Sequence, residues 1–136
     1  AAQSRLLVEL VRDALTEYAY DAEVAGLIGS IDSKLDGITV VAAGYNDKLP
    51  HMLSAVLSTL SNLRIDAQRY DMIKDQVRRG YQNFDQEAPY EHAIYYSSLL
   101  LTERAWTQHE KLAVLDSISP TDVLEFAKAL LARMHL

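Results

Sequence analysis

The sequence contains no cysteine. Disulfides, thiolate nucleophiles and cysteine-ligated zinc are therefore excluded, and a reducing compartment is compatible with this composition. We expect an intracellular protein, located in the cytoplasm. Low-complexity linkers are also absent, so residues 1–136 are expected to form a single domain or a part of one.

Two further absences bear on partners. The 13 lysines and arginines are scattered and outnumbered by 19 acidic residues, so the basic stripe that nucleic-acid phosphates require is missing. No apolar run approaches the roughly 20 residues of a membrane-spanning helix, and the N-terminus lacks a signal-peptide pattern. We therefore expect no nucleic-acid partner and no membrane. The chain begins at Ala1 instead of methionine, and we expect it to be a piece of a longer protein.

The residues that are present form a pattern of amphipathic helices around one hairpin. A stripe of apolar residues with a 3.6-residue period predicts a long first helix over about residues 4–25. The stripe is Leu7, Leu10, Val11, Ala14, Leu15 and Tyr18. The β-branched segments that follow, separated by Asp36-Gly37, predict an antiparallel hairpin over about residues 27–44. A run of helices is predicted next, at about residues 50–63, 66–84, 89–103, 108–116 and 120–134. The apolar stripe of the second of these is Tyr70, Ile73, Val77, Tyr81 and Phe84.

Polar residues mark where several of these helices begin. Asp66 is a predicted N-cap, and Thr107 with Glu110 and Ser119 with Asp122 are predicted capping pairs. The order of helix, hairpin and further helices is typical of an α+β fold. Because a lone two-stranded sheet is marginally stable and its edges invite pairing, we expect sheet strands to be missing at both ends.

The histidines do not complete a zinc-peptidase pattern. Such a pattern places two histidines four positions apart on one helix face, with a glutamate between them that activates water. His109-Glu110 has Ala113 where the second histidine belongs, and Glu91-His92 has Ala88 where the first belongs. The four histidines, interpreted as surface or helix-terminus residues, are His51, His92, His109 and His135.

Serine and phosphate chemistry also lack their usual frames. Gly29-Ser30 lies in a predicted strand, without the Gly-x-Ser-x-Gly turn of a serine nucleophile. The five glycines form no phosphate-binding loop, and turns or strand ends are their expected places. Gly80 is the exception, because a glycine inside a helix can allow a close contact with a neighbouring helix.

Carboxylates and tyrosines remain as weaker candidates. Asp13 with Glu17 and Asp71 with Asp75 have the i,i+4 spacing that paired catalytic carboxylates can use, although solvated helix faces produce such pairs constantly. The clustered tyrosines could line a peptide groove, but most are expected to be partly buried packing residues. No catalytic, cofactor-binding or metal-binding residue is therefore assigned. The tyrosine clusters are Tyr18/Tyr20 and Tyr95/Tyr96.

Several blocks of sequence together resemble one enzyme family. They are residues 17–27 (EYAYDAEVAGL), 44–48 (GYNDK), 83–96 with Asn83-Phe84 and Tyr95-Tyr96, and 100–107 ending in Ala105-Trp106-Thr107. In this order they resemble the insulinase, or pitrilysin-like, family of inverted-zincin metallopeptidases. The resemblance covers essentially the whole chain and is to the family's third domain.

The resemblance implies a place in a large zinc metalloendopeptidase of four homologous domains, whose two halves close around a peptide. In that family the first domain supplies the zinc ligands and catalytic glutamate, and the fourth supplies the main substrate-orienting residues. This chain would then be a non-catalytic part of a metallopeptidase-like α/β sandwich, inactive alone, with Zn²⁺ bound elsewhere in the parent enzyme. Its expected partners are the remaining domains and peptide substrates, and a homo-oligomer is left open.

Two other interpretations of the sequence stay open. The chain could be a scaffold or interaction module that keeps a peptidase-like fold without a metal site, and the parent sequence would show this by lacking His-x-x-Glu-His. It could also be a small stand-alone helical binding protein, which requires a stable monomer without added strands.

Overall fold

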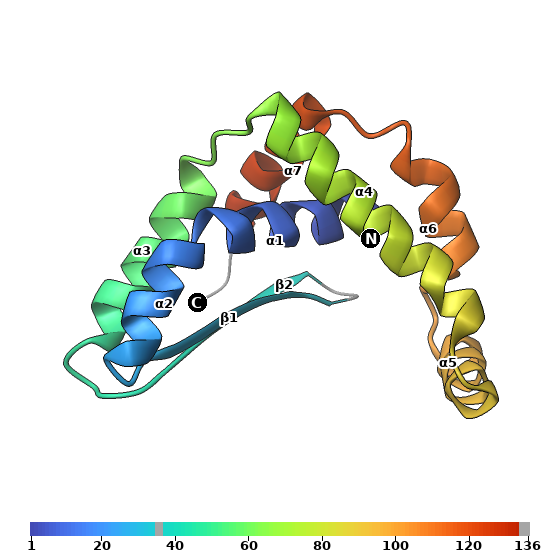
Figure 1. The fold of residues 1–136 in the computed structure, drawn as a ribbon, viewed down its shortest axis with the longest axis horizontal. Coiled ribbons are helices and arrows are strands. Elements are labelled where there is room, and N and C mark those ends of the chain that lie inside the picture. Colours follow the sequence, from blue (N-terminus) through green and yellow to red (C-terminus); the bar gives the residue numbers. More distant parts are fainter. Residues whose placement is uncertain (35–36, 134–136) are drawn as a thin grey trace.

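Helix α1 (Ala2–Ala14) runs through the centre of the molecule, and the other elements are arranged around it (Figure 1). The computed structural model describes residues 1–34 and 37–133. Within these ranges there is one two-stranded sheet, and the remaining elements are helices, which confirms the predicted α+β class. After α1 the elements are α2 (Thr16–Val24), β1 (Ile28–Ser33), β2 (Ile38–Ala43), α3 (Leu49–Ser61), α4 (Ala67–Asn83), η1 (Phe84–Gln86), α5 (Pro89–Leu101), α6 (Gln108–Leu115) and α7 (Pro120–Leu131).

The core is built on α1, which contacts β1, α3, α4, α6 and α7. Leu7, Leu10 and Val11 of the predicted apolar stripe are buried. Leu6 and Val8, which lie outside that stripe, are fully buried as well. Because several elements cover α1, residues on more than one of its faces are buried. A single apolar stripe in the sequence therefore identifies only some of the buried residues.

The single first helix expected over about residues 4–25 is two helices in the structure. The chain turns at Leu15 (φ −93°, ψ −1°), whose N–H lies 3.0 Å from the Val11 carbonyl and 3.2 Å from the Arg12 carbonyl. The hydroxyl of Thr16 also donates to the Arg12 carbonyl, at 3.1 Å. Side-chain donors that bond back to a helix carbonyl tend to bend the helix, which gives a physical reason for the break.

The hairpin pairs β1 and β2 antiparallel, with Ile31 opposite Val40. It is attached to α1 through Arg12, whose Nε donates to the Ile31 carbonyl at 3.0 Å and whose guanidinium pairs with Asp32. Next to the predicted turn, the Lys34 N–H donates to the Gly37 carbonyl at 2.8 Å. Asp36, the other half of the turn dipeptide, lies outside the described residues.

The three predicted helix caps are confirmed. The carboxylate of Asp66 accepts a main-chain hydrogen bond at the start of α4. Thr107 with Glu110 and Ser119 with Asp122 form complete capping boxes, in which each side chain bonds the other residue's backbone N–H. Each box satisfies two backbone donors that a helix start would leave unpaired.

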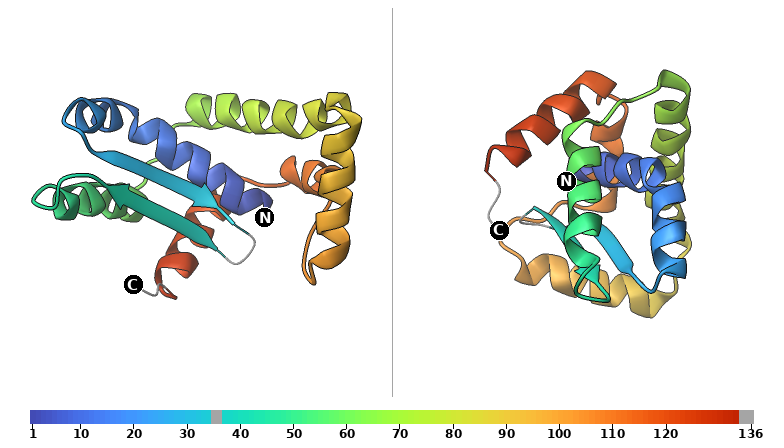
Figure 2. Two further views of the ribbon diagram at one scale, coloured as in Figure 1. Left: turned by 90° about the horizontal axis from the view of Figure 1, so that it is seen from below. Right: turned by 90° about the vertical axis from the view of Figure 1, so that its left-hand side faces the viewer.

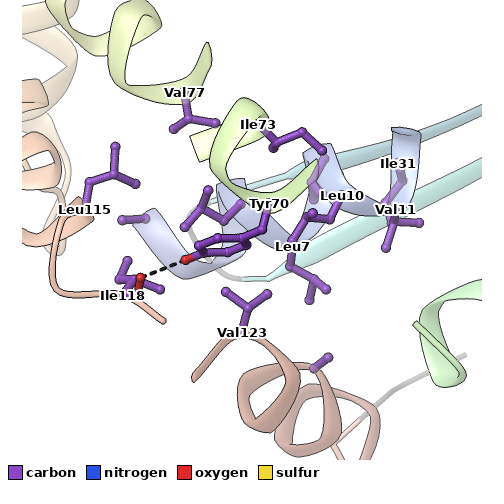
Figure 3. Packing of buried hydrophobic residues seen from close by; sticks show 14 of the residues in the cluster. Leu7, Leu10, Val11, Ile31, Tyr70, Ile73, Val77, Leu115, Ile118 and Val123 are labelled. Atoms are coloured by element: carbon purple, nitrogen blue, oxygen red, sulfur yellow. Dashed lines mark hydrogen bonds between the residues drawn. The ribbon is translucent and has the colours of Figure 1, made fainter. Parts of the chain in front are cut away.

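Helix α4 lies across α1 and presents Tyr70, Ile73 and Val77 to the core (Figure 3). At the far end of α4, η1 leads into α5, which projects at the end of the molecule opposite α2 and α3 (Figures 1 and 2). None of the 13 residues of α5, all of which the structure describes, is buried. The central helix α1 and the elements that cover it thus form the body, and α5 lies at its margin.

Candidate functional site

The described histidines have side-chain neighbours unlike those of a metal site. His92 packs edge-on against the ring of Phe84, with ring centroids 4.6 Å apart, and lies nearly parallel to the ring of Tyr96. His109 Nε2 lies 3.6 Å from a carboxylate oxygen of Asp85, and both side chains are exposed. Among residues 1–34 and 37–133 no group of three His, Cys, Asp or Glu residues could hold a metal ion. His51 is exposed at the start of α3, and His135 lies outside the described residues.

Two of the four candidate carboxylates, Asp13 and Asp75, form ion pairs with arginines. Asp13 accepts from Arg69 at 2.6 and 3.3 Å, which ties α1 to α4. Asp75 pairs with Arg79 at 2.7 Å and with Arg78 at 3.4 Å. The partner carboxylate of the second pair, Asp71, is exposed on α4, and the side chain of Glu17 lies outside the description. These contacts match the solvated-face interpretation of the sequence.

Ser30 and Gly80 also take ordinary places. Ser30 is an exposed residue of the hairpin, paired with Val41. The prediction that Gly80 allows a close helix contact is wrong, because a Cβ added at Gly80 would meet nothing within 4 Å. The helix at this point faces open space.

Three of the eight tyrosines are more exposed than the sequence predicts. Five of the eight are exposed, and only Tyr70, Tyr81 and Tyr95 are buried or half-buried. The expectation of partial burial fails for Tyr20, Tyr45 and Tyr90. Tyr18 (38% exposed) and Tyr96 (45%) remain partly covered, and the Tyr96 ring packs with other aromatic rings. Periodicity could not reveal this, because it places a residue on a helix face without showing whether another element covers that face. The exposed five are Tyr18, Tyr20, Tyr45, Tyr90 and Tyr96.

A hollow of about 970 Å³ lies between the start of α1, the end of β1, α4 and the segment before α6. Its charges are largely matched, since Arg5 pairs with Glu9 at 2.8 Å and Arg79 pairs with Asp75. Burial lowers the pKa of Lys111 in its wall. The buried Oε1 of Gln108 has no hydrogen-bond partner among the described residues. The described part of this wall therefore offers polar contacts, and four of its charged side chains are engaged in ion pairs with one another.

A smaller hollow of about 380 Å³ lies between α1, α2, β1 and α3. Tyr18, Tyr20, Met52 and Val56 contribute apolar surface to it, and Arg12 borders it. Such a lining suits the packing of another apolar segment. Of its two charged residues, Arg12 and Glu23, Arg12 already bonds Asp32.

The most unusual surface belongs to α5 and the residue Trp106 that follows it. We define the α5 surface as five exposed side chains, which are Tyr90 (64% exposed), Ile94 (62%), Leu100 (87%), Leu101 (88%) and Trp106 (46%). Sequence reasoning predicted the helix but missed its exposure. A usable signal was present, because no Asp, Glu, Lys or Arg occurs between Glu91 and Glu103.

The arrangement of these elements is that of a known domain. The sequence profile described as the middle or third domain of peptidase M16 matches residues 1–114. The chain belongs to the M16 peptidase family. The resemblance to insulinase-type peptidases is thereby confirmed, together with the assignment to their third domain.

Individual relatives of this M16 middle domain agree. The chain is 39% identical over 131 residues to the insulin-degrading enzyme of Homo sapiens, covering 96% of this chain and 13% of that protein. It is 36% identical, over 96% of its length and 14% of the relative, to an Arabidopsis thaliana protein named insulin-degrading enzyme-like 1, peroxisomal. The chain therefore spans about one-seventh to one-eighth of the curated relatives it matches.

The crystal structure of pitrilysin contains the same fold. It superposes with a TM-score of 0.88 at 23% sequence identity, covering 95% of this chain and 14% of that one. This match shows the fold over 95% of the chain, and the sequence profile, which ends at residue 114, does not reach α7. No described helix is both long enough and apolar enough to cross a membrane.

Proposed function

We propose that the chain is a non-catalytic structural domain of a longer zinc metalloendopeptidase that degrades peptides inside a closed chamber. The match of residues 1–114 to the middle domain of peptidase M16 carries this proposal. The side chains support it, because His92 is engaged with aromatic rings and His109 lies beside Asp85. The domain would contribute shape and support, and the chemistry would come from other domains.

The described residues do not fit a zinc site. A catalytic zinc site needs three protein ligands at one point and an open position for water. The described histidines lie on α3, α5 and α6, and Asp13 and Asp75 are paired with arginines. Zinc would therefore be held by other parts of the polypeptide, and we derive no catalytic step through this chain.

The role of the domain in such an enzyme would be to form a wall of the chamber. A closed chamber excludes folded proteins by size, and its closure removes water from the reacting groups. The hairpin supports a further point, because a two-stranded sheet with an unpaired edge is marginally stable by itself. We therefore infer that strands from the rest of the polypeptide extend this sheet into an α/β sandwich.

The partners of the chain would then be the other domains of the same polypeptide and the peptides that the enzyme degrades. A homo-oligomer of the parent enzyme is compatible with this role. We place the enzyme inside the cell, in the cytoplasm. This domain contains no cysteine, and a domain without disulfides is compatible with that reducing compartment.

The experiment compares the purified full-length protein with the purified 136-residue chain. Zinc content is measured by elemental analysis, and cleavage of a quenched fluorescent peptide is followed with and without a chelator. We expect bound zinc and chelator-sensitive cleavage in the full-length protein, and neither in the 136-residue chain. Zinc-dependent cleavage by the pure 136-residue chain would overturn the proposal.

A scaffold or interaction module is the second candidate, and the exposed α5 surface favours it. Large exposed apolar residues on a helix are typical of surfaces that bind another protein segment. This candidate predicts a full-length protein that neither binds zinc nor cleaves peptide, so the same two measurements separate the candidates.

A further inference from the structure

Helix α5 exposes several large apolar side chains, which a helix in contact with water is expected to bury. Leu100 and Leu101 are 87% and 88% exposed, and Ile94 is 62% exposed. Leaving a large apolar side chain in water forgoes the stabilisation of about 1.5–3 kcal/mol that its full burial provides. Three such residues within two turns of one helix therefore form a patch with a strong tendency to be covered.

The charges of α5 point the same way. Its 13 residues include one charged side chain, Glu91, whereas the 17 residues of α4 include six. Helices that face water usually carry charged residues on the exposed side, and a helix that is apolar all round is normally buried. The composition of α5 is that of a buried helix.

The placement of α5 is nevertheless defined, because its inner side is attached to the body. The ring of Tyr95 packs against Phe84 with centroids 4.5 Å apart. Its hydroxyl lies 3.4 Å from the Trp106 carbonyl, to which it donates. These contacts hold α5 at the end of α4 and leave the opposite side, with Leu100 and Leu101, uncovered.

The same placement occurs inside a larger protein. The superposition on pitrilysin omits 5% of this chain, about seven residues, which is fewer than the 13 residues of α5. At least about six residues of α5 are therefore included in the superposition, in a protein of which the aligned part is only 14%. The position is a property of the fold, and it is compatible with the presence of further polypeptide.

We propose that the α5 surface is an interface with another part of the same polypeptide, which presents an apolar and uncharged face to Ile94, Leu100, Leu101 and Trp106. This inference rests on the proposed function in one respect, that the 136 residues belong to a longer chain. The relatives are seven to eight times longer than the matched segment, so ample polypeptide is available. A covalently connected partner also acts at a millimolar effective concentration, which favours it over a separate protein.

Two other occupants fit the surface less well. Helices that lie on membranes combine an apolar face with a lysine-rich or arginine-rich face, and α5 contains neither lysine nor arginine. A second copy of the chain would have to bring the same apolar helix to itself at ordinary protein concentration, without the advantage of covalent connection.

The test measures the reactivity of a thiol placed on the α5 surface. Leu100→Cys is made in the full-length protein and in the 136-residue chain, and the labelling rate at this position is followed by peptide-resolved mass spectrometry. Glu125→Cys, on the exposed side of α7, is the control for general differences between the two proteins. We expect labelling at position 100 to be at least about tenfold slower in the full-length protein, after normalisation to position 125.

Three results would overturn the proposal. The first is equal normalised labelling at position 100 in the two proteins. The second is protection that rises with protein concentration, which would identify a second copy as the occupant. The third is protection that appears only when phosphatidylserine vesicles are added, which would identify a lipid surface.

A measurement without substitutions guards against a variant that fails to fold. Amide hydrogen exchange of residues 94–101 is compared between the unmodified full-length protein and the 136-residue chain. Slower exchange in the full-length protein supports the interface, and equal exchange contradicts it. A full-length protein that cleaves peptide with zinc but leaves α5 unprotected would overturn this inference alone. Protection of α5 without zinc-dependent cleavage would instead overturn the proposed function.

Discussion

The hydroxyl of Tyr70 donates a 2.7 Å hydrogen bond to the main-chain carbonyl of Ile118, which lies 48 residues later (Figure 3). The ammonium of Lys74 donates to the same carbonyl at 2.8 Å and to the Asp116 carbonyl at 3.0 Å. These bonds join α4 to the segment between α6 and α7, and both parts cover α1. They also place a lysine near the C-terminal end of α6, where the helix dipole favours a positive charge.

Tyr70→Phe keeps the buried ring and removes only the donor. We expect the free energy of unfolding to fall by about 0.5–1.5 kcal/mol, toward the lower figure because Lys74 still bonds the Ile118 carbonyl. Urea denaturation followed by circular dichroism measures the change. Tyr20→Phe, on an exposed tyrosine, is the control and should change stability by less than about 0.5 kcal/mol. Equal effects of the two substitutions would contradict the role of the hydrogen bond.

Leu7 tests the central position of α1. Its side chain is fully buried, so Leu7→Ala is expected to lower the free energy of unfolding by about 2–5 kcal/mol through lost burial and a cavity. Leu101→Ala removes the same atoms from an exposed site and should change the stability of the 136-residue chain by less than about 0.5 kcal/mol. Thermal and urea unfolding of the two variants measure the difference. If Leu7→Ala left the free energy of unfolding unchanged, the core would not be built on α1.

Two glycines should respond oppositely to alanine. Gly80 lies inside α4 and a Cβ there meets nothing within 4 Å, so Gly80→Ala is expected to stabilise by about 0.5–1 kcal/mol. Gly26 ends α2 with φ +78°, and a Cβ there would lie 3.1 Å from the Tyr45 ring. Gly26→Ala is therefore expected to destabilise by about 1 kcal/mol or more. Comparison of the midpoints of urea unfolding checks both signs, and a destabilising Gly80→Ala would refute the open environment of Gly80.

The capping boxes make stability depend on acid pH. Hydrogen bonds from the Thr107 N–H and hydroxyl lower the pKa of Glu110, and those from the Ser119 hydroxyl and N–H lower the pKa of Asp122. Because the unfolded chain then binds more protons, this stabilisation is present above the unfolded pKa of about 4 and is lost as pH falls through the lower folded values.

The measurement is the free energy of unfolding between pH 7 and pH 3, compared with that of the double variant Glu110→Gln and Asp122→Asn. The unmodified chain should lose stability on acidification, and the double variant should lose less. The double variant Asp47→Asn and Glu103→Gln is the matched control, because it removes two exposed carboxylates and leaves both boxes intact. Identical pH profiles for the unmodified chain and the double variant would show that the boxes do not contribute.

Local chemistry predicted much of this fold. The capping residues Thr107 and Ser119 act on backbone groups three positions away, so their signal is complete within a short segment. Stripes such as Tyr70, Ile73 and Val77 likewise follow helical spacing and are buried as predicted. The hairpin strands followed from their β-branched residues.

The predictions of helix bounds and burial are wrong where contacts with another element determine the structure. The period of α1 continues past Leu15, so the sequence pattern could not show that the chain turns there. Leu6 and Val8 are buried because several elements surround α1, which a single stripe does not indicate. The exposure of Tyr20 and Tyr90 depends on which faces remain uncovered, and this is a tertiary property.

The candidate site shows a similar division. The incomplete patterns around His92 and His109 could be read from spacing alone, and the structure adds that Phe84 and Asp85 are their neighbours. The α5 surface was not predicted, because helical periodicity identifies an apolar stripe without showing whether another element covers it. The uncharged segment between Glu91 and Glu103 was the available signal, and it describes composition without periodicity.

The central claim is that these 136 residues supply structure and no zinc ligand. The most direct test is the zinc content of the full-length protein after all four histidines of this chain are replaced by glutamine, which are His51, His92, His109 and His135. Folding is checked by circular dichroism, and zinc per protein molecule is measured by elemental analysis. We predict the same zinc content as in the unmodified full-length protein. A folded variant that has lost its zinc would contradict the account.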